Sequence, residues 1–456
     1  MEFNDGAELL LKELDSVKDE LIEYFSVQPR DPSRLELSKL ARSLWVRLPE
    51  ERILKAQAEA SSLGVIAVDS SLQGEIYAHG RALYMLRSVA VSPWETRCIL
   101  KVEFDASTKS RSITSVMRLL AETLEYKAAL QLLRNTPPNS RTVVLLDGSL
   151  YVRLARTPVE YLVDRHRDAY LIAMEAFLEL YEEALKRNAV IVGISKDSLS
   201  EHFKLALTRE LICGILTQEL SGKLSSKLAE LPLTKLLSLT KLALGKESLS
   251  SNSKRMLRSL LRELHRRHSD FSFIMGLDVG TGFSTPMLLG CLRTRCLRRF
   301  NMVVKHGVVE AVRIIWRRHI RALQSLGTPS EARLFIRRAS RILLSLKQIP
   351  AIITMYVMPR EHDIPLRVDI LPTTESPSLP SFYEFRNVRF TSANLDRLNL
   401  VLDIVLGGYA DPRVYNTWLY VAHRAAKLTK KEFTALESFL RGVGLNLIPR
   451  RRRWVG

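Results

Sequence analysis

The sequence has few cysteines and lacks a run of apolar residues long enough to cross a bilayer. Only four of its 456 residues are cysteine, and the one closely spaced pair, Cys291 and Cys296, has no second pair or histidine set to complete a zinc site. We therefore expect free or buried thiols, with a single disulfide as the alternative. No apolar run approaches the roughly 18–20 residues of a membrane-spanning helix. The first residues are acidic and do not form a signal peptide, so a cytoplasmic protein is expected.

A phosphate-binding P-loop is also absent. No Gly-x4-Gly-Lys-Ser/Thr pattern occurs, and the glycine-rich stretch 276–282 lacks the lysine and is interpreted as a turn. The chain is therefore not expected to be an NTP-driven motor. Wholesale disorder is excluded as well, because apolar residues make up 46% of the chain, enough for a sizeable core spread over two or three domains.

Positive charge is what the sequence has in excess. It contains 68 Lys+Arg against 49 Asp+Glu, a net charge of +19. This excess suggests a polyanionic partner, most simply nucleic acid, with a generally basic proteome as the alternative. Clustering of the arginines favours nucleic acid. The clusters are Arg293, Arg295, Arg298 and Arg299, then Arg313, Arg317, Arg318 and Arg321, and finally residues 450–453.

Two apolar runs that each end in an aspartate organise the chain. The run at 63–71 stops at Asp69, and the run at 142–150 stops at Asp147. Continuous apolar runs predict strands that are covered on both faces. If the two strands are neighbours, their carboxylates come within reach of one divalent cation, and hydrolysis of a phosphodiester is typically assisted by two such cations. For Asp69 taken alone, capping of a turn is the alternative.

The order of the expected elements indicates the fold class. Strands are predicted at 63–71, 75–92 and 97–104, then a helix at 112–134, a strand at 142–150, a helix at 159–188 and a strand at 189–194. The first three strands, with short connections, form an antiparallel meander. This order is typical of ribonuclease-H-like folds, in which the first and fourth strands are parallel neighbours. We therefore expect an α/β protein with a mixed sheet and flanking helices, which would make Asp69 and Asp147 adjacent.

The rest of the chain is expected to add helices around this core. The predicted segments are an N-terminal helical segment at 1–60, the first part of the core at 61–198, a helical insertion at 199–268, and the remainder of the core with C-terminal helices and a basic tail at 269–456. In the last segment, strands are predicted at 271–277, 288–291, 302–306, 351–357 and 366–371, and helices at 308–326, 330–346, 396–406, 414–426 and 430–443.

The N-terminal segment carries an apolar stripe with no obvious partner in the sheet. The stripe consists of Leu9, Leu10, Leu14, Val17 and Leu21. Because an unpartnered stripe tends to be buried by another subunit, we expect these helices to mediate contacts in a homodimer.

A third carboxylate is expected on the helix that crosses the sheet. Glu122 and Glu125 are the candidates, and their spacing of three places them on nearly one helical face. Leu124, Ala128 and Ala129 indicate close packing around Glu125, so Glu125 is favoured as the third carboxylate. The alternative is that both are exposed helix charges.

Three further positions are candidates for the site. Lys196 follows a buried strand and is either a contact of the scissile phosphate or a surface lysine. Arg367 and Asp369 share one face of a strand, as a structural salt bridge or as catalytic groups. His423 lies on a helix face of small residues, where a buried, hydrogen-bonded histidine is the alternative to a ligand.

Four motifs, in this order, resemble the archaeal NurA family of nucleases. They are Ala-Val-Asp-Ser-Ser at 67–71, Leu-Leu-Asp-Gly-Ser-Leu at 145–150, Gly-Ile-Ser-Lys-Asp-Ser at 193–198, and Gly-Gly-Tyr-Ala-Asp-Pro at 407–412 followed by Ala-His-Arg-Ala-Ala-Lys at 422–427. The resemblance covers most of residues 60–445. It implies catalytic roles for Asp69, Asp147, a helix glutamate (Glu122 or Glu125) and His423, with Asp69, Asp147 and Glu125 as the metal ligands.

The resemblance also implies a function. It implies a manganese-dependent DNA nuclease, with magnesium possible and two metal ions expected, that acts as a single-strand endonuclease and a 5′–3′ exonuclease. The implied assembly is a homodimeric ring that works with the hexameric HerA ATPase in resection of DNA ends for recombinational repair. The alternatives are an RNase or Holliday-junction resolvase on the same fold, or a catalytically inactive DNA-binding adaptor for an ATPase.

Overall fold

The chain forms two compact units. The computed structural model describes residues 12–19, 32–106, 110–136, 141–196, 199–219, 228, 230–245, 249–265, 269–325, 329–372, 379–391 and 397–449. Unit 1 comprises Met1–Leu44, Leu199–Glu230 and Lys235–Val279, and unit 2 comprises Trp45–Ser198, Leu231–Thr234 and Gly280–Gly456. The sequence predicts that residues 1–60 are a segment separate from the insertion at 199–268. Instead, residues 1–44 and most of the insertion belong to one unit, and residues 45–60 belong to the other.

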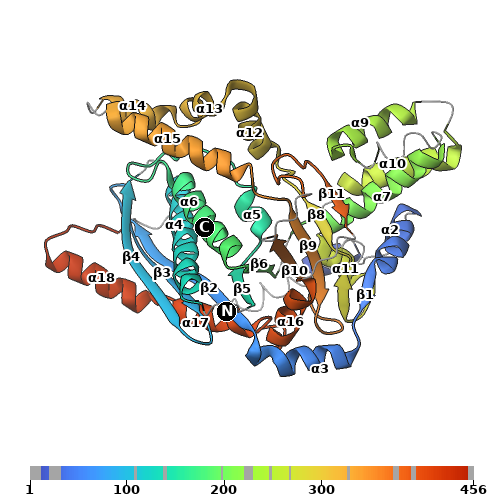
Figure 1. Cartoon of the computed structure of the whole chain (residues 1–456), viewed down its shortest axis with the longest axis horizontal. Coiled ribbons are helices and arrows are strands. Elements are labelled where there is room, and N and C mark those ends of the chain that lie inside the picture. Colours follow the sequence, from blue (N-terminus) through green and yellow to red (C-terminus); the bar gives the residue numbers. More distant parts are fainter. Residues whose placement is uncertain are drawn as a thin grey trace. The chain divides into compact units, whose positions relative to one another are not determined.

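Unit 2 is built on a mixed sheet, which has eleven strands within the described residues. The strands are β1 (Trp45–Arg47), β2 (Gly64–Ile76), β3 (Arg81–Val91), β4 (Thr96–Ala106), β5 (Thr142–Asp147), β6 (Val190–Ser195), β7 (Gly282–Ser284), β8 (Met287–Leu289), β9 (Ile352–Met358), β10 (Leu366–Leu371) and β11 (Val388–Phe390). Their order is β1-β7-β9-β10-β6-β5-β2-β3-β4, with β8 paired to β9 and β11 (Figure 1). The predicted fold class, an α/β protein with a mixed sheet and flanking helices, is confirmed.

The pairing of β2 with β5 is the feature that positions the site. The two strands are parallel, with Val65 opposite Val143 and Val68 opposite Leu146. All four of these residues are buried, since both faces of this part of the sheet are covered. Strands β2, β3 and β4 form the expected antiparallel meander. The prediction that the first and fourth strands of this region are parallel neighbours is therefore confirmed.

Helices cover the two faces of the sheet. In unit 2 they are α3 (Glu50–Glu59), the 3-10 turn η1 (Ala60–Ser62), α4 (Ser110–Arg134), α5 (Leu150–Leu154), α6 (Ala169–Lys186), α12 (Thr294–His306), α13 (Val308–Ile315), α14 (Arg317–Ser325), α15 (Pro329–Leu346), α16 (Leu398–Gly408), α17 (Thr417–Ala426) and α18 (Lys430–Gly442). Helix α4 packs on β2 and β3 and is backed by α6 (Figure 1). Val65 and Ala67 belong to a core cluster with Val401, Leu419 and Ala422 of α16 and α17, so these helices cover the opposite face of β2.

The N-terminal segment has partners within the chain. Helix α3 packs against α16, and Ala56 is fully buried in the core of unit 2. Helix α3 therefore packs within its own chain, and the role of the N-terminal helices in a homodimer stays a prediction. Of the predicted stripe, Leu14 is exposed and Val17 is half-buried. Leu9, Leu10 and Leu21 lie outside the described residues.

Several predicted elements differ from the structure, among them the helix predicted at 308–326, which is divided into α13 and α14. The runs at 271–277 and 302–306, predicted as strands, lie in helices α11 (Asp270–Met275) and α12. Short apolar runs do not distinguish strand from helix, and here the buried residues Cys296, Phe300 and Val303 follow helical spacing. The helix predicted from residue 159 begins only at Ala169. The loop before it is held by Asp105, whose carboxylate accepts backbone N–H groups from residues 164–166.

Unit 1 is helical, as predicted for the insertion. Its helices include α2 (Pro32–Ser43), α7 (His202–Glu219), most of α9 (Leu233–Leu244), α10 (Ser251–His265) and α11, and residues 12–19 are helical as well. The buried carboxylate of Asp270 accepts the backbone N–H groups of Phe203 and Lys204, each at 3.0 Å, and so caps the start of α7. In neither unit is a described helix long and apolar enough to span a membrane.

Candidate active site at the ends of strands β2 and β5

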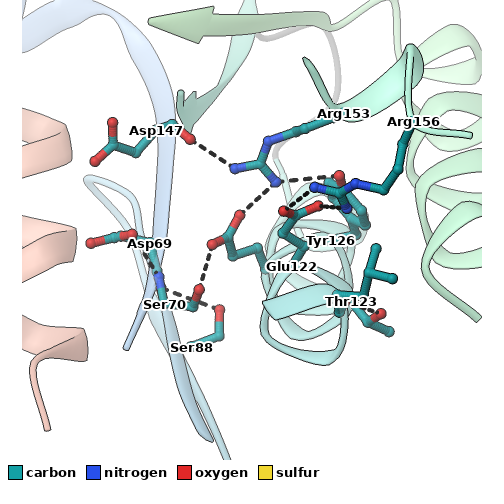
Figure 2. Close-up of polar contacts among 11 residues, drawn as sticks. Asp69, Ser70, Ser88, Glu122, Thr123, Tyr126, Asp147, Arg153 and Arg156 are labelled. Carbon is teal, nitrogen blue, oxygen red and sulfur yellow. Dashed lines mark hydrogen bonds and ion pairs between the residues drawn. The ribbon is translucent and has the colours of Figure 1, made fainter. Parts of the chain in front are cut away.

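Asp69 and Asp147 lie next to each other where the parallel pairing of β2 and β5 ends. The last paired residues are Val68 and Leu146, so the two aspartates follow at the same edge. Directly after Asp147, Gly148 adopts a φ of 95°, a backbone conformation that residues with a side chain rarely adopt, and the chain turns sharply. Figure 2 shows the two carboxylates pointing in the same direction. The expectation that strand pairing brings them together agrees with this geometry.

The carboxylate of Asp69 is fixed by two hydrogen bonds. Its Oδ1 accepts the backbone N–H of Ser70 at 2.8 Å, and its Oδ2 lies 2.7 Å from Nδ1 of His423 on α17. Burial raises the pKa of Asp69 above its usual value, and the nearby charge of Asp147 raises it further, against the lowering effect of the His423 hydrogen bond. The side chain of His423 is 58% exposed, so it connects the buried aspartate to solvent.

Asp147 is held by a tyrosine. The hydroxyl of Tyr415 donates to Asp147 Oδ1 at 2.8 Å. Burial and the charge of Asp147 raise the pKa of Tyr415, so it remains a protonated donor. The ammonium of the exposed Lys196 lies 4.9 Å from the centroid of the Tyr415 ring. Tyr415 thus contacts both Asp147 and Lys196, and the phosphate contact expected of this lysine stays a prediction.

Glu125 meets the site from the other face of the sheet. Because side chains alternate along a strand, Ser70 points away from Asp69 and toward α4, where its hydroxyl donates to Glu125 Oε1. The other oxygen, Oε2, lies 2.7 Å from Arg153 Nη1, and both partners are buried. Burial raises the pKa of Glu125 to about 7, although Arg153 acts in the opposite direction.

Glu122 is committed to another arginine. Its two oxygens accept from Arg156 Nη1 and Nη2 at 2.7 and 2.8 Å, a bidentate pair (Figure 2). Burial alone would raise the pKa of Glu122, but the charges of Arg153 and Arg156 outweigh it and the pKa is lowered. Glu122 is therefore an ionised partner of Arg156 that points away from the aspartates.

The predicted candidates thus fall into two groups. Asp147 and Lys196 contact Tyr415, and His423 contacts Asp69, whereas Glu122 and Glu125 pair with arginines on the α4 face. Within the described part of the chain, no three His, Cys, Asp or Glu side chains lie close enough together to hold a metal ion. In this arrangement Glu125, the expected third ligand, has Ser70 and Arg153 as its neighbours, and its place in a metal site stays a prediction.

Arg367 and Asp369 form a buried structural network. Arg367 Nε donates to Asp369 Oδ1 at 2.9 Å, and Asp369 also accepts from the hydroxyls of Ser149 and Thr354, each at 2.7 Å. Both charged residues are buried. Burial would raise the pKa of Asp369, but Arg367 and these hydrogen bonds lower it. The structural reading of the pair is therefore supported, and the network fixes the turn that follows Asp147.

Tyr415 and Arg153 are two residues of the site that are not among those predicted from the sequence. Tyr415 precedes the helix cap Asn416 and carried no signal, because its contact with Asp147 spans 268 positions. Arg153 did carry one: it interrupts the apolar run 150–154, and an arginine in such a run is buried only if it is paired. The four cysteines are free thiols, as expected.

The chain is similar to proteins of one described family. A family model described as the NurA domain matches residues 63–428, which contain every candidate above. Among solved structures, the NurA nuclease from Sulfolobus solfataricus is 11% identical over all of both chains, with a TM-score of 0.48. A NurA bound to dAMP and manganese is 15% identical over 97% of each chain, with a TM-score of 0.37. A NurA with manganese is 14% identical over 98% of this chain and 99% of the other, also with a TM-score of 0.37. No curated protein matches the chain.

Proposed function

Because this chain belongs to the NurA family of nucleases, we propose that it is a metal-dependent deoxyribonuclease whose catalytic centre contains Asp69 and Asp147. The observation that carries this proposal is the placement of the two carboxylates side by side at the ends of parallel strands. Each is hydrogen-bonded to a residue of the C-terminal segment, His423 for Asp69 and Tyr415 for Asp147.

The two aspartates fit a divalent cation. The charge of Asp147 raises the pKa of Asp69, a repulsion that a bound cation would relieve. Asp147 Oδ2 makes no hydrogen bond to the described part of the chain. Carboxylate oxygens suit Mn²⁺ and Mg²⁺, and we propose Mn²⁺, the cation that the family resemblance implies. When bound, the cation neutralises charge on the phosphate and activates water for its attack.

The surrounding side chains orient the reacting groups. Tyr415 fixes one oxygen of Asp147 and directs the other away from its hydroxyl. His423 holds Asp69 through Nδ1 and is partly open to solvent, so its other ring nitrogen is placed to exchange a proton with substrate or water. The exposed ammonium of Lys196 contributes positive charge for the scissile phosphate.

Glu125 contributes charge to this centre. The charge of Asp69 is one of the causes that raise the pKa of Glu125. In the described arrangement its oxygens bind Ser70 and Arg153, so Glu125 would join a metal only after leaving Arg153. We therefore propose Asp69 and Asp147 as the principal ligands and Glu125 as a third that depends on that release.

A cleavage assay tests the function. A 5′-labelled single-stranded DNA is expected to be cut in the presence of Mn²⁺ and to stay intact when the metal is chelated. A matched RNA and a four-way DNA junction test the alternatives on the same fold, and we expect both to be cut more slowly than the single-stranded DNA. Intact DNA in every metal condition would indicate the inactive adaptor instead. Labels at each end would report the proposed single-strand endonuclease and 5′–3′ exonuclease activities.

The assembly that we propose is a homodimer that works with a HerA-type hexameric ATPase in resection of DNA ends for recombinational repair. This proposal rests on the family resemblance. Light scattering of the purified chain, alone and mixed with such an ATPase, is expected to give the mass of a dimer and then that of a larger complex. A chain that is a monomer alone and remains one in the mixture would contradict it. The cytoplasmic location stays a prediction from the sequence.

A further inference from the structure

Helices α12 to α15 carry a large share of the positive charge of the chain. Residues 293–347 contain 14 Lys+Arg and only two Asp+Glu, a net charge of +12 out of the +19 of the whole protein. These helices lie together in unit 2, where α15 packs against α6 (Figure 1). They contribute none of the residues proposed above for catalysis.

The charges lie on the outer face of this helical layer. The inner face is apolar: Phe300 stacks on Tyr383, Trp316 contacts Tyr170, and Phe335 is buried beside Trp316. Ten arginines of the layer are exposed, namely Arg293, Arg295, Arg298, Arg313, Arg317, Arg318, Arg321, Arg333, Arg337 and Arg341. The layer therefore presents to solvent a surface, here called the arginine face, that is formed by these ten residues.

The arginines on helix α15 are regularly spaced. Arg333, Arg337 and Arg341 recur every four residues, so they form one row along the helix. The row extends over about 12 Å at 1.5 Å per residue, which corresponds to three or four phosphates of one DNA strand at about 3.4 Å each. Like charges at this spacing destabilise a helix, so the row opposes folding unless an anionic partner relieves it.

Acidic residues of the protein neutralise little of this charge. Within the described residues of 293–347, the ion pairs are those of Arg313 with Glu310, of Arg338 with Asp168 and Glu175, of Arg341 with Glu175, and of Lys347 with Glu384. The pairs of Arg338 and Arg341 fasten α15 to α6. Most of the arginine face therefore serves neither folding nor docking of the layer.

We propose that the arginine face binds the phosphate backbone of DNA, independently of sequence, as a second contact away from the catalytic centre. The proposal rests on the proposed function, since DNA is the substrate there. Arginine suits this role because its planar guanidinium binds phosphate oxygens through two parallel hydrogen bonds. A set of exposed arginines of this density matches the repeating negative charge of DNA. The face would hold long DNA while the strand end reaches Asp69 and Asp147.

The test is a binding measurement without metal. The variant R317Q/R333Q/R337Q removes three charges from the arginine face, and R47Q/R81Q/R134Q removes three from exposed arginines elsewhere in unit 2. Affinity for a fluorescein-labelled duplex of thirty base pairs is measured by anisotropy in a chelator, over a range of salt concentrations. For the first variant, the magnitude of the slope of log affinity against log salt concentration is expected to fall by about two to three. Its affinity for the duplex is expected to fall about tenfold or more. The control is expected to stay within about twofold of the wild type.

Further readouts separate the possible failures. R317K/R333K/R337K keeps the charge and is expected to retain most of the affinity, whereas unfolding of the glutamine variant would appear in its circular dichroism. The substrate bis(p-nitrophenyl) phosphate is too small to reach the arginine face from the catalytic centre. Its cleavage with Mn²⁺ is therefore expected to be unchanged in both glutamine variants. Failure of the wild type to cleave DNA overturns the proposed function but leaves the binding result standing. A wild-type slope in R317Q/R333Q/R337Q, or equal losses in the control, would overturn the DNA-binding face and favour an acidic protein as its partner.

Discussion

Replacement of Asp69 or Asp147 with asparagine is expected to slow Mn²⁺-dependent cleavage of DNA at least about 1,000-fold. The reason is that each variant removes one of two adjacent negative charges that we propose hold the cation, and metal catalysis supplies several kcal/mol of transition-state stabilisation. A loss of about 4 kcal/mol corresponds to a factor of about 1,000 in rate. Single-turnover cleavage of a labelled single strand measures the effect directly.

Asparagine preserves the shape of the side chain, so both variants are expected to fold normally. Burial and the charge of Asp147 raise the pKa of Asp69, so removal of either charge also removes a repulsion in the folded protein. Asp164→Asn is the matched control, because Asp164 is an exposed aspartate of the same unit. The two-aspartate centre is wrong if either site variant keeps more than a tenth of the wild-type rate while its melting temperature is unchanged.

Replacement of Arg153 with methionine is expected to lower the free energy of unfolding of unit 2 by about 3–5 kcal/mol. Arg153 and Glu125 form an ion pair in which the side chains are only 8% and 6% exposed. Removal of one partner leaves a buried carboxylate without its cation, which is far more costly than loss of a surface pair. Arg153 also donates to the backbone carbonyl of Asp147 at 2.7 Å, so the same change loosens the candidate site. Urea titration of the purified protein gives the change in stability.

A double variant separates the ion pair from other effects of the substitution. R153M/E125M replaces both charges with apolar side chains and is expected to recover most of the lost stability, because no unpaired charge remains in the interior. Arg156→Met is the comparison, since the pair of Arg156 with Glu122 is more exposed, at 23% and 17%, and should cost less. If Arg153→Met is no more destabilising than Arg156→Met, or if the double variant is as unstable as the single one, the buried pair does not have this role.

The part of the site that could be predicted from the sequence depends on local patterns. The apolar runs before Asp69 and Asp147 each identify a buried strand and its end, and the order of elements predicts that the strands are parallel neighbours. The spacing between Glu122 and Glu125 places them on one helix face, but sequence spacing does not show which cation each one meets. Arg156 and Arg153 decide that, and neither is near the glutamates in the sequence.

The unpredicted part depends on contacts between distant segments. Tyr415 reaches Asp147 and His423 reaches Asp69 only because α17 packs on β2, a contact between segments about 350 positions apart. The row of arginines on α15 became apparent only when exposure was known, because a helical sequence alone does not show which face is outward. Helix α12 was mistaken for a strand because its short apolar run at 302–306 was judged without the buried residues that precede it in the same helix.

Binding of Mn²⁺ itself is the decisive observation for the proposed centre. Electron paramagnetic resonance of free Mn²⁺ during titration with protein reports how much metal is bound, independently of DNA and of turnover. The wild-type chain is expected to bind Mn²⁺ saturably, and Asp164→Asn is expected to match it. D69N/D147N is expected to show no site of comparable affinity, because both proposed principal ligands are gone. Saturable binding by D69N/D147N with the wild-type affinity and stoichiometry would contradict the assignment of these two aspartates as the metal site.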